Sequence, residues 1–235
     1  MSHCELVVAR YREDLAWLRR VPPAIRVTVY DKGGDASGAV SLPNIGREAQ
    51  TYLYHLATRY EDLADISVFC QGRPFDHVPE LHTVLRQLAA GEYGVPGFRW
   101  LGFVVDHDDR TGSRLFRNWT KNPARRPLPM DTFWKELWAE PAPERCTFYL
   151  GAHFAVSRQQ VRRQPRSFYE KALQISRTLP DAAHCFERCW DRVFAADGIP
   201  AAFRSRAWPV YLRPVQRLSL SWSDVENDRR LAGLI

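Results

Sequence analysis

The first third of the chain alternates between short apolar runs and segments with a helical apolar period. Three apolar runs predict buried strands, at residues 5–10 (ELVVAR), 25–30 (IRVTVY) and 66–70 (ISVFC). Residues 47–60 predict an amphipathic helix, because apolar side chains recur every three or four positions, at Ala49, Tyr52, Leu53 and Leu56. A shorter helix is expected after Glu13 and Asp14, whose carboxylates favour a helix start.

A strand–helix–strand–helix–strand order predicts a parallel sheet with right-handed crossovers. The fold class expected is therefore α/β, with a mostly parallel central sheet and helices on both faces. The 235 residues suit one domain. In such a sheet Arg10, Asp31 and Gln71 all lie at the carboxyl edge, where open α/β sheets bind their ligands.

The rest of the chain is less regular. Further elements are expected in the order helix 80–90, strand 98–105, strand 146–156, a helix from residue 158, and helices 167–179 and 182–195. Residues 111–144 carry five prolines around a short helical piece at 132–139, and we interpret them as an irregular connection that covers the site. Residues 219–235 are expected to form a mobile tail.

Composition narrows the functional classes. The hydrophobic content of 45% is sufficient for a core, and the chain has no run of about 18 apolar residues. The amino-terminal residues lack the layout of a secretory signal, so a cytoplasmic protein without a membrane partner is expected. The five cysteines have no metal-type pairing and are interpreted as free buried thiols.

The net charge of +6 comes mainly from arginine, since only four of the 33 basic residues are lysines. Arginine is a planar bidentate donor to phosphate, which favours a polyanionic partner. Basic residues that could contact a nucleic acid backbone form two groups, Arg117, Lys121, Arg125 and Arg126, and Arg158, Arg162, Arg163 and Arg166. The second group is expected to project from one helical face. A solubilising surface is the alternative for both.

Polar residues gather at the predicted carboxyl edge of the sheet. The candidates are Arg10, Asp14, Asp31, Asn44, Arg47, Glu48, Gln71, Asp76 and His77. Each has a structural alternative, as a helix-start acid, a turn residue or a surface side chain. Asp106 and Asp108 form an Asp-x-Asp pattern that could hold a divalent metal and a nucleotide diphosphate, or simply a solvated acidic turn. No nucleophile elbow, phosphate-binding loop or zinc-ligand spacing is present.

An ordered set of segments resembles a known family. The segments are ELVVARYREDLAWL, VYDKGG, LPNIGREAQTYLYHL, VFCQGRPFDH, GAHFAVSR with FYEKAL, and ERCWDRVF. They resemble a family catalogued as a domain of unknown function with a glycosyltransferase-A-like (Rossmann-like) core, some of whose members are described as arginine-containing cyclodipeptide synthases. The chain departs from the family at Arg12, where Asn is usual, and at Cys70, where an aliphatic residue is common.

The resemblance implies an enzyme that joins arginyl-tRNA and a second aminoacyl-tRNA, with no cofactor, metal or stable protein partner. Such a reaction needs a base for the α-amine, for which Glu187 and His77 are candidates. It also needs donors to the ester oxygen, such as Gln71 and Arg47. Asp14, Asp31 and Glu48 are candidate partners of the guanidinium, and Ser157 is either an acyl acceptor or a helix cap. The alternatives are a nucleotide-sugar-dependent glycosyltransferase with a metal at Asp106 and Asp108, and a non-catalytic RNA-binding module.

Overall fold

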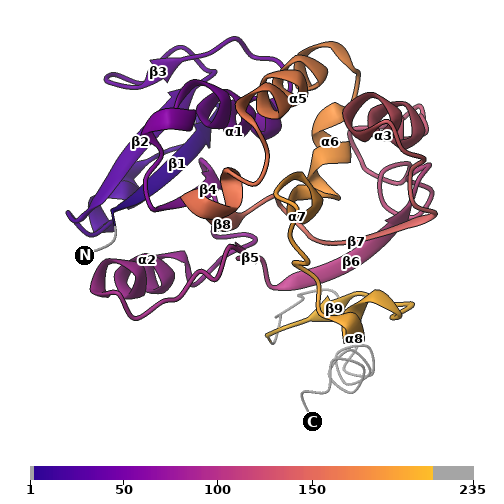
Figure 1. Ribbon diagram of the computed structural model, residues 1–235. Helices are drawn as coiled ribbons and strands as arrows, with labels where there is room; N and C mark the ends of the chain where they lie inside the picture. Colours follow the sequence, from indigo (N-terminus) through magenta and orange to yellow (C-terminus); the bar gives the residue numbers. More distant parts are fainter. Residues whose placement is uncertain (1–2, 214–235) are drawn as a thin grey trace.

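A six-stranded, mostly parallel sheet forms the centre of the computed structural model, which describes residues 3–213 (Figure 1). The strand order is β3-β2-β1-β4-β8-β5. The strands are β1 (Cys4–Arg10), β2 (Ile25–Asp31), β3 (Val40–Ser41), β4 (Ile66–Gln71), β5 (Phe98–Trp100) and β8 (Phe154–Ser157). The pairs β1-β2, β1-β4 and β2-β3 are parallel, whereas β8 is antiparallel to β4 and β5. The predicted mixed α/β class is confirmed.

The register of the central strands brings their carboxyl ends to one edge. Arg10 pairs with Asp31 and Ala9 pairs with Gln71, so the last residues of β1, β2 and β4 are neighbours. Parallel pairing of three strands with similar apolar runs produces this alignment, because the same part of each strand must be buried. The predicted edge of Arg10, Asp31 and Gln71 is therefore confirmed.

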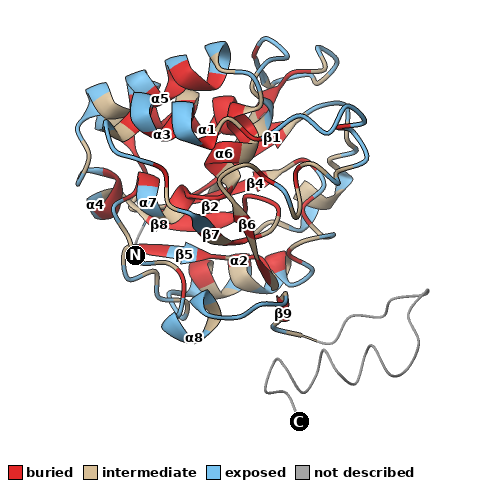
Figure 2. Cartoon of the chain, turned by 90° about the vertical axis from the view of Figure 1, so that its right-hand side faces the viewer, coloured by how far each residue is buried: buried red, intermediate tan, exposed pale blue. Residues whose placement is uncertain are grey.

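Helices cover both faces of the sheet (Figure 1). One face packs against α1 (Arg47–Thr58), α5 (Arg166–Thr178) and α6 (Ala182–Glu187) through a large apolar cluster that contains Tyr52 and Phe154. The opposite face packs against α2 (Leu81–Ala90) through a smaller cluster with Leu6 and Val68. Buried positions concentrate on the strands and on the inner faces of these helices (Figure 2).

Two predicted strands are each divided in the structure. The predicted strand 98–105 is wrong as one element, because β5 ends at Trp100 in the main sheet and β6 (Val104–Asp109) begins a second sheet. The predicted strand 146–156 likewise separates into β7 (Arg145–Tyr149) and β8. The second sheet has the order β7-β6-β9, with β9 at Val210–Tyr211.

Three helix predictions also need correction. The first crossover contains the short 3-10 helix η1 (Ala16–Arg20). The helix expected from residue 158 is only α4 (Arg158–Val161), and Pro165 separates it from α5 because proline cannot continue a helix. The helix predicted at 182–195 breaks into α6 and α7 (Trp190–Val193).

The remaining described elements are η2 (Tyr60–Asp62), α3 (Met130–Trp138) and α8 (Ala201–Arg204). The five cysteines, all within residues 3–213, are buried and form no disulfide there, as predicted. Across residues 3–213, no helix combines the length and the apolar character needed to cross a membrane. The tail predicted at 219–235 lies outside the described residues.

Candidate functional site

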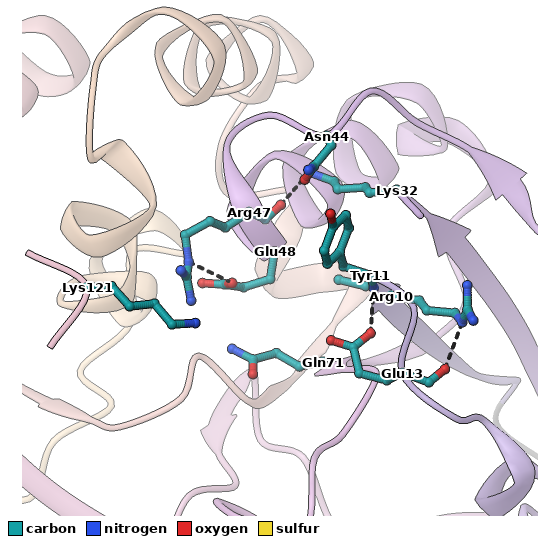
Figure 3. A pocket seen from close by; sticks show the side chains of 10 residues that line it. Arg10, Tyr11, Glu13, Lys32, Asn44, Arg47, Glu48, Gln71 and Lys121 are labelled. Atoms are coloured by element: carbon teal, nitrogen blue, oxygen red, sulfur yellow. Dashed lines mark hydrogen bonds and ion pairs between the residues drawn. The ribbon is translucent and has the colours of Figure 1, made fainter. Parts of the chain in front are cut away.

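Two adjoining cavities open at the carboxyl edge of β1, β2 and β4. The first has a volume of about 330 Å³ and is lined by Ala9, Arg10, Tyr11, Glu13, Lys32, Asn44, Arg47, Glu48, Gln71 and Lys121. The second has a volume of about 310 Å³ and is lined by Arg47, Glu48, Gln71, His77, Leu115, Phe116, Trp119, Phe148, Leu150, Gly151, His184, Glu187 and Arg188. Arg47, Glu48 and Gln71 line both cavities, and in Figure 3 these side chains converge on a shared space with Lys121.

A strained turn presents Arg47 and Glu48 at the start of α1. Gly46 has φ of 60° and Arg47 has φ of 50°, two consecutive residues in the left-handed region that favours glycine. A Cβ at position 46 would lie 2.4 Å from the carbonyl oxygen of Ser176, so the turn also requires glycine for space. Lys32 Nζ donates to the carbonyl oxygens of Ile45 and Arg47, at 2.5 Å each, and holds the turn closed.

Glu48 is the carboxyl group at the junction of the cavities. Its side chain is 10% exposed, and Arg47 Nε lies 3.6 Å from its Oε2. Burial raises the pKa of Glu48 above its ordinary value; the charge of Arg47 opposes this, and the negative charge of Glu187 adds to it. A raised pKa makes the Glu48 carboxylate a stronger proton acceptor than an ordinary glutamate.

Glu187, in contrast to Glu48, has a lowered pKa. Its Oε1 accepts from the Gly151 N–H at 2.8 Å, and its Oε2 lies 3.8 Å from His184 Nδ1 and 3.9 Å from an Arg188 nitrogen. Burial alone would raise the pKa of Glu187, but His184, Arg188 and the Gly151 N–H outweigh it and lower the pKa to about 2. Glu187 is therefore a permanent anion in the second cavity, better suited to hold a cation than to accept a proton.

Gln71, the last residue of β4, and His77, in the loop that follows, both line the second cavity. Gln71 Nε2 donates to the Gly151 carbonyl at 3.2 Å, so its amide is oriented across the cavity floor. The His77 ring lies against the buried His153 ring, with the ring centres 5.7 Å apart. Burial lowers the pKa of His153 to about 3, and both of its ring nitrogens lack a hydrogen-bond partner within residues 3–213.

Arg10 and Asp31 are committed to the framework of the first cavity. Arg10 donates to Asp31 at 2.8 Å and to Asp35 at 2.5 Å. Asp31 also accepts from the N–H groups of Gly33, Asp35 and Ala36. Although burial would raise the pKa of Asp31, these donors lower it to about 2. Asp31 therefore closes the loop after β2, and little of its carboxylate is left for a substrate.

The remaining edge candidates differ in position. Asn44 lines the first cavity. Asp14 is exposed and accepts from the Ala16 N–H as a turn acid, and Asp76 is exposed and pairs with Arg73 at 3.3 Å. Neither acid lines either cavity. Arg12, where the family usually has Asn, has φ of 66°, a region that Asn tolerates better than Arg does.

The loop that precedes α3 contributes to the rim of both cavities. Leu115, Phe116 and Trp119 line the second cavity and Lys121 lines the first. Arg47 and Lys121 both lie over the Trp119 ring, at 5.2 and 5.8 Å from its centre. The other members of this predicted basic group are engaged within the protein: Arg117 and Arg125 contact Thr111 and Asn118 of the same loop, and Arg126 contacts Asp181, which precedes α6.

The second predicted group of arginines lies at the opposite edge of the sheet. Arg158 pairs with Asp65, which precedes the first residue of β4, whereas Gln71 ends that strand. Arg162 lies 3.8 Å from Glu61, and Arg166 pairs with Glu170 at 2.9 Å. Arg163 is exposed in the turn between α4 and α5. The prediction of one helical face is wrong for this group, because α4 ends before Arg162.

Ser157 lies at the same far edge. Its hydroxyl accepts from the Gln160 N–H at 3.1 Å and caps α4, and its backbone pairs with Ile66 at the start of β4. The structure therefore gives Ser157 the role of a helix cap and does not bring it to the cavities.

The Asp106–Asp108 pair belongs to the second sheet. Asp108 is fully buried and accepts from the N–H groups of Arg114, Leu115 and Phe116 and from Arg188, the last at 2.6 Å. Asp106 accepts from the Arg114 guanidinium. Within residues 3–213 no group of three or more His, Cys, Asp or Glu side chains has the geometry of a metal site.

Among the charged and histidine side chains that line the cavities, Glu13, Lys32, His184 and Arg188 were not predicted as functional. Lys32 occurs in a Gly-rich loop and gave no periodic signal. Arg188 directly follows Glu187 in the segment ERCWDRVF, and His184 precedes Glu187 by three residues in the predicted helix, so proximity to Glu187 is the signal that could have identified both.

A protein family described as "Protein of unknown function (DUF3431)" matches residues 6–204. This span contains every residue that lines the two cavities. No curated protein is a significant match to the chain.

Proposed function

The chain belongs to this family of unknown function, and from the two carboxyl groups of its cavities we propose that it is an aminoacyl-tRNA-dependent cyclodipeptide synthase that uses arginyl-tRNA. The observation that carries the proposal is the contrast between Glu48, whose pKa is raised, and Glu187, whose pKa is about 2. When two carboxyl groups have well separated pKa values, one can transfer a proton while the other stays charged and binds a cation.

The second cavity suits the arginyl side chain. Glu187 supplies a permanent negative charge, and its Oε2 has no partner closer than 3.8 Å among the ion pairs of the site. Trp119, Phe116 and Phe148 supply aromatic surface for a planar guanidinium. The nearby Arg188 charge is compensated by Asp108 at 2.6 Å, which reduces its repulsion of a bound guanidinium.

The reacting groups would meet at the junction of the cavities. The α-amine of one aminoacyl-tRNA attacks the ester carbonyl carbon of the other; a C–N bond forms, the ester C–O bond breaks, and the 3′ oxygen of the tRNA leaves. Glu48 takes the amine proton and returns it to that oxygen. Gln71 and Arg47 would donate to the developing negative charge.

A second attack closes the ring. The free amine of the dipeptidyl ester attacks the remaining ester carbonyl, a second C–N bond forms, and the second tRNA leaves with its proton. Two ester bonds are exchanged for two amide bonds, so the reaction needs neither ATP nor a redox cofactor. This chemistry requires a carboxyl base with a raised pKa and hydrogen-bond donors to an oxyanion.

The finer fold assignment, a glycosyltransferase-A-like core, is part of the same proposal. The parallel β2-β1-β4 centre and the site at its carboxyl edge support it. The alternative of a metal-dependent glycosyltransferase has less support, because Asp106 and Asp108 are already engaged by Arg114, Arg188 and backbone N–H groups.

Mass spectrometry of medium from a host that expresses the protein tests the proposal. We expect a new diketopiperazine that contains arginine, retained in Asp14→Asn and reduced by about 10²- to 10⁴-fold in Glu48→Gln. Asp14→Asn is the matched control because Asp14 is exposed and does not line the cavities. Folded wild-type protein that yields no such product in a host with intact arginyl-tRNA would overturn the proposal.

A further inference from the structure

Lys32 is a buried ammonium group with part of its donor capacity still available. It is 9% exposed, and two of its N–H bonds are directed at the carbonyl oxygens of Ile45 and Arg47. A lysine ammonium carries three N–H donors. Figure 3 shows Lys32 among the side chains that line the first cavity, so its third N–H is available to a group bound there.

The surroundings of Lys32 favour a negatively charged oxygen. Arg47 and Lys121 line the same cavity, and the first turn of the 12-residue helix α1 begins at Arg47 with its N–H groups not yet paired within the helix. The charge of Arg10 is compensated by Asp31 and Asp35. Glu13 and Glu48 also line the cavity and oppose an anion, which limits its affinity.

We infer that the first cavity is a binding site for a phosphate-type oxyanion, in which Lys32, Arg47 and Lys121 are the donors. The inference deepens the proposed function and rests on it for its biological ligand, which would be a phosphate of the tRNA 3′ end. The arginines at the far edge of the sheet play no part in this site, because Asp65 and Gln71 lie at opposite ends of β4.

The anion site should depend on pH through Lys32. Burial lowers the pKa of Lys32 to about 8, an effect that Arg177 strengthens and Glu48 opposes. Above that pH the ammonium loses the proton that supplies its charge. The other charged or titratable side chains around the cavity are Arg10, Tyr11, Glu13, Arg47, Glu48 and Lys121. Hydrogen bonds to Asp35 and Asp31 raise the pKa of Arg10, so this guanidinium keeps its charge. Anion affinity is therefore expected to fall about tenfold for each pH unit above 8.

Titration calorimetry with sodium sulfate tests the inference, because the charge of sulfate is constant from pH 7 to 9.5. Sodium chloride at matched ionic strength corrects for screening. Wild-type affinity should fall by about tenfold between pH 8.5 and 9.5, and Lys32→Met should lose binding. Lys32→Arg should keep binding and lose the pH dependence, since arginine does not titrate in this range. Lys121→Ala should bind several-fold more weakly and keep the pH dependence.

Lys171→Met is the matched control, since Lys171 is an exposed lysine that contacts Leu137 away from the cavities. Equal sulfate affinity at pH 7 and 9.5 in the wild type, or wild-type affinity in folded Lys32→Met, would overturn the inference. Glu48→Gln separates the two proposals, because it should abolish diketopiperazine formation while sulfate binding persists. Product formation without sulfate binding refutes the anion site alone, and sulfate binding without product refutes the synthase alone.

Discussion

The buried Asp108 and the partly buried Glu187 share one arginine, yet their surroundings differ. Arg188 lies 2.6 Å from Asp108 Oδ2 and 3.9 Å from Glu187 Oε2. Asp108 accepts from three backbone N–H groups of the following loop as well, whereas Glu187 accepts from only one, that of Gly151, among the bonds described. Asp108 is part of the framework, and Glu187 faces a cavity with one oxygen held only at long range.

An acidic pattern in the sequence therefore does not by itself identify a functional acid. Asp106-x-Asp108 is the more recognisable motif, but both carboxylates already accept hydrogen bonds. Asp106 accepts from Arg114, and Asp108 accepts from Arg188 and from backbone N–H groups. The functional candidates, Glu48 and Glu187, occur in no such motif. The number of donors around each acid, and their distances from its oxygens, distinguish an acid of the framework from an acid of the site.

The largest effect on stability is expected for Asp108→Ala. The substitution leaves the Arg188 guanidinium buried without its closest carboxylate and also removes the side-chain acceptor of four backbone N–H groups. Breaking a buried pair in this way typically costs about 3–5 kcal/mol. Urea denaturation at pH 7 measures the change in the free energy of unfolding. A loss below about 1 kcal/mol would contradict the assignment of Asp108 to the framework.

Glu187→Gln should have a smaller effect that depends on pH. The folded-state pKa of Glu187 is about 2 against an ordinary value of 4.5, so its ionised form contributes about 3 kcal/mol of stability at pH 7. That contribution is complete above pH 4.5 and is lost as the pH falls towards 2. The unfolding free energies of wild type and variant should therefore converge at acid pH. Parallel curves would contradict the low pKa.

Glu48→Gln should change stability least among the three acids. Because the pKa of Glu48 is raised in the folded state, ionisation at neutral pH works against folding, and a neutral amide removes that cost. We expect a free energy of unfolding equal to or slightly above that of the wild type, measured by the same denaturation. A clear loss of stability would assign Glu48 to the framework with Asp108.

The smallest effects are expected at the far edge. The double substitution Arg162→Ala and Arg163→Ala removes two exposed side chains, one of them in a 3.8 Å ion pair with Glu61. Exposed pairs contribute about 0–1 kcal/mol, so both stability and diketopiperazine yield should stay close to the wild type. A large loss of product with stability retained would indicate that these arginines do contact the tRNA.

The sequence predicted the part of the fold in which apolar pattern and burial coincide. Strands β1, β2 and β4 and helix α1 were placed within about two residues because their apolar runs are continuous and each packs in the main sheet or against it. The alignment of Arg10, Asp31 and Gln71 followed from parallel pairing alone.

Other features depend on contacts that a linear pattern does not contain. Phe98–Trp100 and Val104–Asp109 are both apolar enough to be strands, but nothing in their pattern says that they enter different sheets. The approach of Glu48 to Glu187 requires the packing of α1 against α6, and the role of Lys32 depends on a left-handed turn at Gly46. Local periodicity carries no information on such long-range packing.

The most direct test of the central claim uses purified protein, arginyl-tRNA labelled with ¹³C in its arginine, and unlabelled aminoacyl-tRNA, with no ATP present. With wild-type protein we expect the label to pass into a diketopiperazine. The Glu48→Gln variant, which should be equally stable, is expected to form little or none. Label that remains on tRNA or appears only as free arginine with folded wild-type protein would contradict the central claim.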